Sequence, residues 1–375
     1  MVRKNNQLFI VLVSILQFIL LITIFIIFPV NSIAGEKPDS LIQSRIKTHF
    51  YPYLFYTPET HLAFGAAAIS YFRSSSDTSS KPSQITLSGY YSTRKQYIVT
   101  FTPEIYLQND NYFIPMDLHF GDFADKFWGI GNKTPDFPNP DYRIRSYGIN
   151  IAIKPKIKSN FKAGVIIELK NANIVDKKSN PYLISNSARG SNGGMTFGSG
   201  MGVSLDSRDN IFYPSRGSFY ELNILIFSRM WGSDFDFNRY ILNLRQYLSI
   251  TSNHLLAIQF YGNFVGGYPP FYELPALGGQ NLMRGYFLGR YRDKQYVLAQ
   301  AEYRTSLLWR IGLVGFAGVG DVTDRLALIQ LSELKYSVGA GLRFALDVRE
   351  KLNVRIDFGI GKNSSGIYFA IEEAF

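Results

Sequence analysis

The residues best suited to specific chemistry lie in one glycine- and arginine-rich stretch, Leu277 to Asp293, which reads LGGQNLMRGYFLGRYRD. Its three arginines load the loop with fixed positive charge, so the loop needs a water-filled or acidic cavity. The stretch is too polar for a strand, and alternating segments flank it on both sides. A long loop of this kind inside a compact protein is usually functional, although a solvated surface loop is the simpler alternative. The motif residues of this candidate site are Gly278, Gly279, Arg284, Gly285 and Tyr286.

The rest of the chain offers little for catalysis or metal binding. It has no cysteine, which excludes thiolate metal sites and cysteine nucleophiles. No Gly-x-Ser-x-Gly motif is present, and no Ser/His/Asp cluster or phosphate-binding loop stands out. The four histidines have no metal-ligand spacing; they are His49, His61, His119 and His254. We therefore expect no enzyme activity, cofactor or metal. An enzyme is the weakest of the alternatives.

The N-terminus has the pattern of a targeting segment. Arg3 and Lys4 precede an apolar run from Leu8 to Val30, and Ser32-Ile33-Ala34 ends it with small residues. This predicts a signal peptide over residues 1–34, cleaved after Ala34. The run is also long enough to cross a bilayer, so an uncleaved anchor is the alternative. Residues 35–50 are then expected to form a short periplasmic lead.

Composition limits what the remaining chain can be. It contains 25 Tyr and 30 Phe among 375 residues, with a mean hydropathy of −0.03. After Gly35 no run of 18 apolar residues occurs, so an integral membrane protein would have to be a β-barrel. The net charge of +10 falls to +8 without Arg3 and Lys4, and the basic residues form no nucleic-acid motif. No nucleic-acid partner is expected.

Alternation with a period of two marks most of the chain as strands. Between Phe161 and Lys170, for example, apolar residues alternate with a mostly polar set that includes Lys162, Glu168 and Lys170. About 15 such segments can be counted, and a gap around residues 108–141 leaves space for one more. Because a closed barrel needs an even number, we expect about 16 antiparallel strands over residues 51–375, a transmembrane β-barrel. A soluble β-sandwich explains the pattern less well.

The motifs together resemble the bacterial surface antigen family, the barrel shared by BamA- and TamA-type assembly factors and, more distantly, by two-partner secretion transporters. The resemblance covers roughly residues 52–375. It is carried by the loop motif, the turn from Asp206 to Gly217, the Tyr56-Thr57-Pro58-Glu59 entry and the final Phe375.

The resemblance implies a loop that folds back into the lumen, where its arginine pairs with acidic residues of the following strands. Glu302 matches the first acidic partner of the family. The second is usually an aspartate two residues after a strand phenylalanine, but Phe316 is followed there by Gly318, so Asp321 is expected to substitute. Phe369, Ile371 and Phe375 are expected to share one face of the last strand as a C-terminal assembly signal.

The same resemblance implies a role in the insertion, assembly or translocation of outer-membrane proteins or related clients. The implied partners are outer-membrane lipid, periplasmic accessory chains, unfolded client proteins, and the barrel assembly machinery for the chain's own insertion. The implied location is the outer membrane of a Gram-negative-type bacterium. The alternative is a passive or gated pore or a structural outer-membrane barrel. Small residues such as Gly65 in the first expected strand, His61 to Phe72, suggest an adaptable seam.

Overall fold

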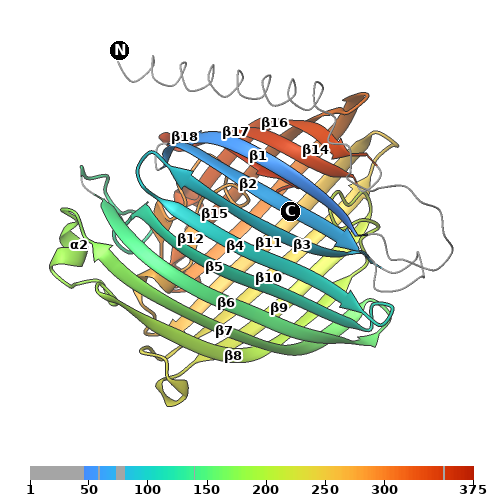
Figure 1. Cartoon of the computed structure of the whole chain (residues 1–375). Coiled ribbons are helices and arrows are strands. Elements are labelled where there is room, and N and C mark those ends of the chain that lie inside the picture. The colour runs from blue at the N-terminus through green and yellow to red at the C-terminus, as the bar shows by residue number, and fades with distance from the viewer. Residues whose placement is uncertain (1–45, 58–59, 73–80, 139, 349–350) are drawn as a thin grey trace, which may run out of the picture.

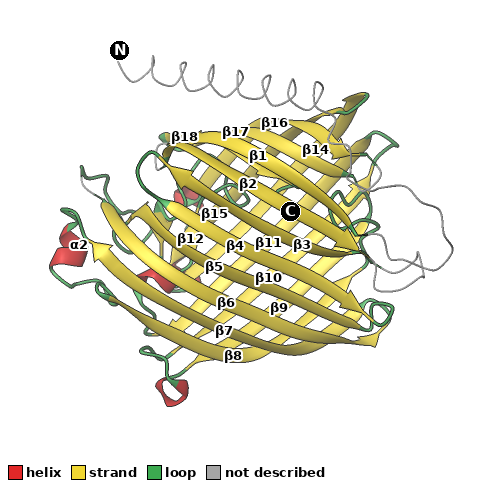
Figure 2. Cartoon of the chain, in the orientation of Figure 1, coloured by secondary structure: helices red, strands yellow, loops and turns green. Residues whose placement is uncertain are grey.

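The computed structural model describes residues 46–375, except 58–59, 73–80, 139 and 349–350. The predicted signal peptide and most of the lead lie outside this range. Sixteen strands form one antiparallel sheet in nearly sequential order (Figures 1 and 2). No helix among these residues is long and apolar enough to cross a bilayer. The strands are β1(Lys47–Thr57), β2(His61–Phe72), β3(Ser83–Ser92), β4(Tyr97–Leu107), β5(Tyr112–Lys126), β6(Asp141–Lys158), β7(Phe161–Asp176), β8(Gly193–Asp206), β9(Gly217–Phe227), β10(Phe237–Ser249), β11(His254–Gly267), β14(Gln295–Leu308), β15(Ile311–Thr323), β16(Lys335–Asp347), β17(Leu352–Gly361) and β18(Ser364–Ile371).

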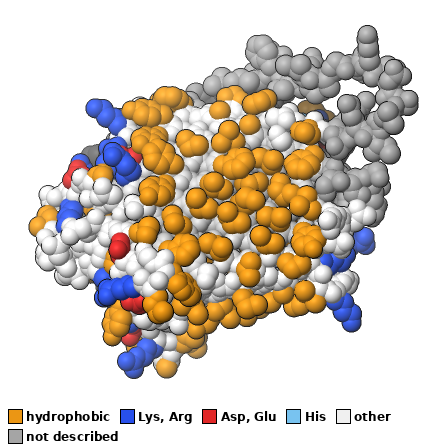
Figure 3. Space-filling view, turned by 60° about the horizontal axis from the view of Figure 1, so that its bottom comes forward, with side chains coloured by type: hydrophobic (Ala, Val, Ile, Leu, Met, Phe, Trp, Pro, Cys, Tyr) orange, Lys and Arg blue, Asp and Glu red, His pale blue; other side chains and the backbone are white. Residues whose placement is uncertain are grey.

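The sheet curves into a barrel whose outer face is apolar. Hydrophobic side chains cover the middle of the face seen in Figure 3, and charged side chains gather toward its two ends. Along β7, for example, Val165 and Ile167 are exposed, whereas Ile166 between them is buried. This alternation places one set of side chains against lipid and the other inside. The expected architecture is therefore confirmed.

The strand missing from the count of 15 is β1, not a strand within residues 108–141. Its aromatic run, Phe50 to Tyr56, contains Pro52 and shows no alternation. Proline donates no backbone hydrogen bond. It is tolerated in β1 because this strand is the first of the sheet and pairs with β2. The strand starts at Lys47, so the last residues of the expected lead, 47–50, belong to β1. Gly65 consequently lies in β2, between two neighbours, and not at the seam.

Two short strands and a helical turn sit within the connections. The strands β12(Ala276–Leu277) and β13(Tyr291–Arg292) pair at the base of the arginine-rich loop. The helix α2(Pro181–Ile184) follows β7, and Asn180 accepts hydrogen bonds from its first backbone N–H groups. Because successive strands are antiparallel, the connections alternate between the two ends of the barrel. The loop after β11 is therefore at the opposite end from the β8–β9 turn and the residues after β18.

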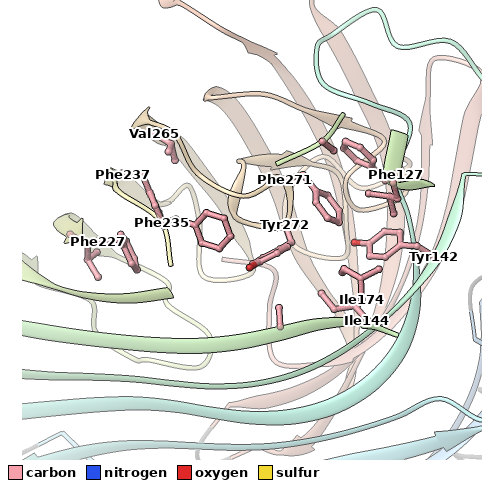
Figure 4. Close-up of a cluster of buried hydrophobic side chains, with 14 of the residues drawn as sticks. Phe127, Tyr142, Ile144, Ile174, Phe227, Phe235, Phe237, Val265, Phe271 and Tyr272 are labelled. Carbon is pink, nitrogen blue, oxygen red and sulfur yellow. The ribbon is translucent and has the colours of Figure 1, made fainter. Parts of the chain in front are cut away.

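An aromatic cluster fills part of the interior near the loop end. Phe271, from the segment after β11, packs against Phe127 and Tyr142, with ring centroids 4.7 and 5.3 Å away (Figure 4). Phe227 and Phe237 stack at 4.1 Å in the same cluster. Burial of such large rings contributes strongly to stability. The cluster holds the first part of the β11–β14 connection in place.

Candidate functional site

The arginine-rich loop folds back on itself and then runs along the polar face of the last strands. The β12–β13 pair closes its base, and the Gly279 N–H donates to the Tyr286 carbonyl at 3.1 Å. Its middle is almost completely buried: Met283, Arg284 and Tyr286 expose 1% or less of their surface. A polar loop becomes buried in this way only if its charges and backbone groups find partners.

Arg284 finds two carboxylates. Its Nη2 forms an ion pair with Glu302 on β14, and its Nη1 lies 2.5 Å from Asp357 Oδ2 on β17. The guanidinium also sits 3.6 Å from the ring centroid of Phe316 on β15. The loop arginine is thus held by residues of three different strands, and its expected contact with Glu302 is present.

The second carboxylate is Asp357, which corrects the expectation of Asp321. Asp321 pairs with Lys335 at 3.3 Å and accepts a hydrogen bond from Asn132 at 2.9 Å. Gly318, where the family pattern has its aspartate, would place a Cβ 3.4 Å from Met283 Sδ. The loop methionine therefore packs close to this position, and the acid is supplied from β17.

Both carboxylates belong to a larger group that we call the arginine cluster. Arg304 Nη2 lies 2.7 Å from Glu302 Oε2, and Arg343 Nη1 and Arg355 Nη1 each lie 2.6 Å from an Asp357 oxygen. Four guanidinium groups thus share three side-chain carboxylates. Its members are Arg284, Arg304, Arg343, Arg355, Glu302, Asp357 and Glu373.

Backbone contacts fix the loop as closely as the charges do. The Gly285 N–H donates to Tyr368 Oη on β18 at 2.8 Å, and Ser337 on β16 donates to the Arg284 carbonyl. Gly285 has φ 111°, and a Cβ there would lie 2.7 Å from the Ile360 carbonyl carbon. Only glycine fits this position without displacing β17. Tyr286 Oη donates to the Tyr336 carbonyl at 3.0 Å.

The other two loop arginines bind the opposite side of the entrance. Arg290 donates two 3.0 Å hydrogen bonds to Thr134 and lies over the Trp128 ring. Arg292 Nη2 is 3.0 Å from Asp125 Oδ2 at the end of β5. The loop therefore bridges from the β5–β6 connection to the wall formed by β14 to β18.

At the other end of the barrel, the turn from Asp206 to Gly217 folds inward. The Asn210 side chain accepts the N–H groups of Phe212 and Tyr213, both at 2.8 Å, which stabilises a tight turn. Phe212 is 4% exposed and packs in a cluster with Tyr51, Ile69, Tyr71 and Leu352. This second motif of the sequence is thus an interior structural element.

The residues after β18 also turn inward, which corrects the expected shared face for the C-terminal signal. The strand ends at Ile371, and Glu372 adopts φ 72°. Phe375 is 4% exposed and clusters with Tyr247, Leu255 and Ala257, on the inner side of β10 and β11. Phe369 and Ile371 are half-buried on β18. Alternation failed here because the chain leaves the strand before Phe375.

Glu372, just beyond the last strand, has a raised pKa. Loss of hydration raises its pKa to about 7. A hydrogen bond from Gln84 Nε2, at 2.9 Å, opposes the shift, whereas the charge of Glu104 adds to it. A carboxyl group with this pKa changes its charge near neutral pH.

A cavity of about 1850 Å³ lies between the loop and the strands β18 and β1 to β5. Its β3 and β4 wall is rich in neutral polar groups, including Thr86, Ser88, Thr100 and Thr102. Tyr286, Phe287 and Arg290 line its loop side. The interior is thus packed against β14 to β17 and hollow along β18 and β1 to β5. Among the described residues, no group of three or more acids and histidines is arranged to hold a metal.

Comparison with known proteins identifies the fold and the family. The chain is similar to BamA from Haemophilus ducreyi lacking POTRA domains 1–3, with a TM-score of 0.56 and 12% identity over 88% of this chain and 69% of that one. It is also similar to CdiB from Acinetobacter baumannii (TM-score 0.56, 12% identity) and CdiB from Escherichia coli (TM-score 0.55, 11% identity). Each match covers 88% of this chain, but only 60% and 63% of the respective CdiB chains.

No curated protein matches the chain. The Omp85 superfamily domain matches residues 81–375, most of the sequence. This match confirms the resemblance inferred from the loop and turn motifs, and it places the protein in the outer membrane of Gram-negative bacteria. Members of this superfamily are in general not enzymes. The chain is an outer-membrane β-barrel that belongs to the Omp85 superfamily.

Proposed function

We propose that this barrel takes part in the insertion, assembly or translocation of outer-membrane proteins or related polypeptide clients, with the Arg284 loop anchored in its lumen. Membership of the superfamily and likeness to BamA and CdiB barrels support a role with polypeptides. Accessory chains in the periplasm and unfolded clients are the partners that this role requires. Phe369 and Ile371 on the last strand are proposed as contacts for the machinery that inserts this barrel.

The observation that carries the proposal is the position of the loop arginine. Arg284 bridges β14 and β17 through two carboxylates, and the adjacent backbone reaches β16 and β18. The loop therefore ties together the last strands of the sheet. A client that displaces the loop would change the packing of this whole wall, because charges left unpaired inside a barrel are costly.

The proposal can be tested with the refolded protein in proteoliposomes. A urea-unfolded eight-stranded outer-membrane protein is added as the client, and its folded, protease-resistant fraction is followed over time. We expect faster client folding than in protein-free liposomes. Equal rates in the two preparations would contradict an insertion role.

Two carboxylate-to-amide variants link the activity to the loop. Glu302→Gln removes a buried partner of Arg284, and we expect it to abolish most of the acceleration. Glu333→Gln changes an exposed ion pair with Lys133, whose side chain is 70% exposed, and should leave the rate unchanged. Full activity of Glu302→Gln, in a preparation shown to be folded, would separate the loop from function.

A gated pore is the second candidate, and the cavity beside the loop favours it. The cavity has a polar, largely uncharged wall on β3 and β4. A hydrated solute could occupy such a space without breaking ion pairs of the barrel wall. Conductance measurements distinguish a gated pore from a barrel that handles polypeptide clients.

A further inference from the structure

Residues 372–375 make contacts typical of a bound peptide. They lie beyond the last strand, outside the sheet's β-ladder, and yet two of them are almost fully buried. The Glu372 N–H donates to the Asn353 carbonyl at 2.8 Å, and Arg355 Nε donates to the Glu372 carbonyl at 3.1 Å. The inner wall thus provides specific partners for the backbone of this segment.

The Glu373 side chain lies against positively charged residues of the inner wall. Its carboxylate lies 2.7 Å from Arg343 Nε and accepts a hydrogen bond from Asn353 Nδ2 at 2.9 Å. Arg304 Nε approaches the same carboxylate at 4.0 Å. Only 2% of the glutamate side chain is exposed, so these contacts replace nearly all of its hydration.

Phe375 occupies an apolar position next to it. Its ring packs with Tyr247, Leu255 and Ala257 of β10 and β11, and Tyr213 of the β8–β9 turn borders this group. Arg304 Nη2 donates to the main-chain oxygen of Phe375 at 2.7 Å. The wall therefore contacts an acidic residue and, two positions later, an aromatic one.

Arg304 connects this site to the loop. The same guanidinium that binds Phe375 also binds Glu302, and Glu302 in turn binds Arg284. We propose that the inner wall carries a peptide-binding site for an acidic-aromatic segment, occupied here by residues 372–375, and that its occupancy positions Arg304 and thereby holds the Arg284 loop. The inference deepens the proposed function because it rests on the loop anchorage and adds a second control over it.

The test uses a cysteine introduced into the loop. The chain contains no cysteine, so Met283→Cys, at a position with 0% exposure, gives a single reporter of loop release. In the refolded protein, Phe375→Ala should increase the rate at which a small maleimide labels this introduced cysteine about tenfold, because the segment no longer holds Arg304. Phe212→Ala is the matched control, since it removes a buried ring at the same end that belongs to a separate cluster.

A second measurement examines the site itself. A variant that lacks Glu373 to Phe375 is prepared in the same Met283→Cys background, and the synthetic peptide Glu-Glu-Ala-Phe is added. We expect the peptide to slow labelling of the loop cysteine toward the parental rate, and Gln-Gln-Ala-Phe to have a weaker effect. If the truncated variant does not fold, Glu373→Gln combined with Phe375→Ala is used for the labelling comparison.

The outcomes separate the two proposals. Fast labelling in Glu302→Gln together with an unchanged rate in Phe375→Ala would overturn the segment's role and leave the loop anchorage intact. Unchanged rates in both variants would overturn the anchorage as well. An equal increase in Phe375→Ala and Phe212→Ala would show general loosening of that end and would also overturn the site.

Discussion

At the scale of single residues, the arginine cluster depends on its acids more than on its bases. Asp357 contacts three guanidinium groups, those of Arg284, Arg343 and Arg355. Because three buried guanidinium groups share this one carboxylate, its removal leaves several buried cations with too few partners. An acid is therefore the residue whose loss should be most damaging.

Asp357→Asn is predicted to lower the free energy of unfolding by about 3 to 5 kcal/mol, the usual cost of breaking a buried ion pair. Urea titration of the refolded protein, followed by the heat-shifted band on gels, measures the effect. Asp321→Asn is the control: this acid is equally buried but pairs with one lysine. Equal destabilisation by the two variants would contradict the special position of Asp357.

A second residue-scale prediction concerns pH. The pKa of Glu372 is about 7 in the folded protein and 4.5 ordinarily, so the folded state binds the extra proton between these values. Stability should therefore fall as pH rises from about 4.5 to 7. Glu372→Gln should remove this dependence and be more stable than the parent at pH 8, by about 1 to 3 kcal/mol.

Thermal unfolding of both proteins at about pH 4 and about pH 8 tests this prediction. Their midpoints should agree at the lower pH, where the parent is also protonated, and differ at the higher. A parent that is more stable than the variant at high pH would show that the charged carboxylate is favourable.

Sequence reasoning reached part of this site and missed the rest for a physical reason. The Arg284–Glu302 pair followed from the family resemblance, whereas Asp357 was not identified as a partner of the loop. Which of several inward acids meets the loop depends on the loop's path, however. That path is set by packing such as Met283 near Gly318, which no local pattern shows.

At the scale of elements, the position of the loop depends on the close approach of its backbone to β17. Gly285→Ala would force a Cβ to within 2.7 Å of β17 and strain a φ of 111°. We predict that the loop is displaced, so that in the Met283→Cys background the introduced cysteine is labelled as fast as in Glu302→Gln. Gly315→Ala is the control, because a Cβ there has no atom within 4 Å. Slow labelling in Gly285→Ala would mean that β17 can shift to make room for the added methyl group.

Strands with clear alternation were predictable, and those without it were not. β7 faces lipid on one side and polar groups on the other, so its pattern is distinct. β1 contains Pro52 among consecutive aromatic residues, so its strand character comes from pairing with β2 and not from its own pattern. Phe375 was misplaced because the path of the chain after Ile371 is fixed by Arg304 and Arg343, which are distant in sequence.

At the scale of the whole molecule, the barrel is filled from both ends. The loop enters from one end, and the β8–β9 turn and residues 372–375 enter from the other. The two fillings meet at Glu302, which joins Arg284 to Arg304. The cavity of about 1850 Å³ remains on the side formed by β18 and β1 to β5. The loop is therefore the element whose removal would enlarge the interior most.

Deletion of Leu277 to Asp293 tests whether the loop closes the barrel. β11 and β14 stay connectable, because Phe264 and Gln295 are already paired across the strands. In planar bilayers we predict an almost silent parent protein and large conductance steps for the deletion, since the cavity would then join the space left by the loop. Deletion of the exposed turn Arg229 to Gly232 should leave the parent behaviour unchanged. Steady, large conductance in the parent itself would instead favour an open pore, in which the loop lines the channel without closing it.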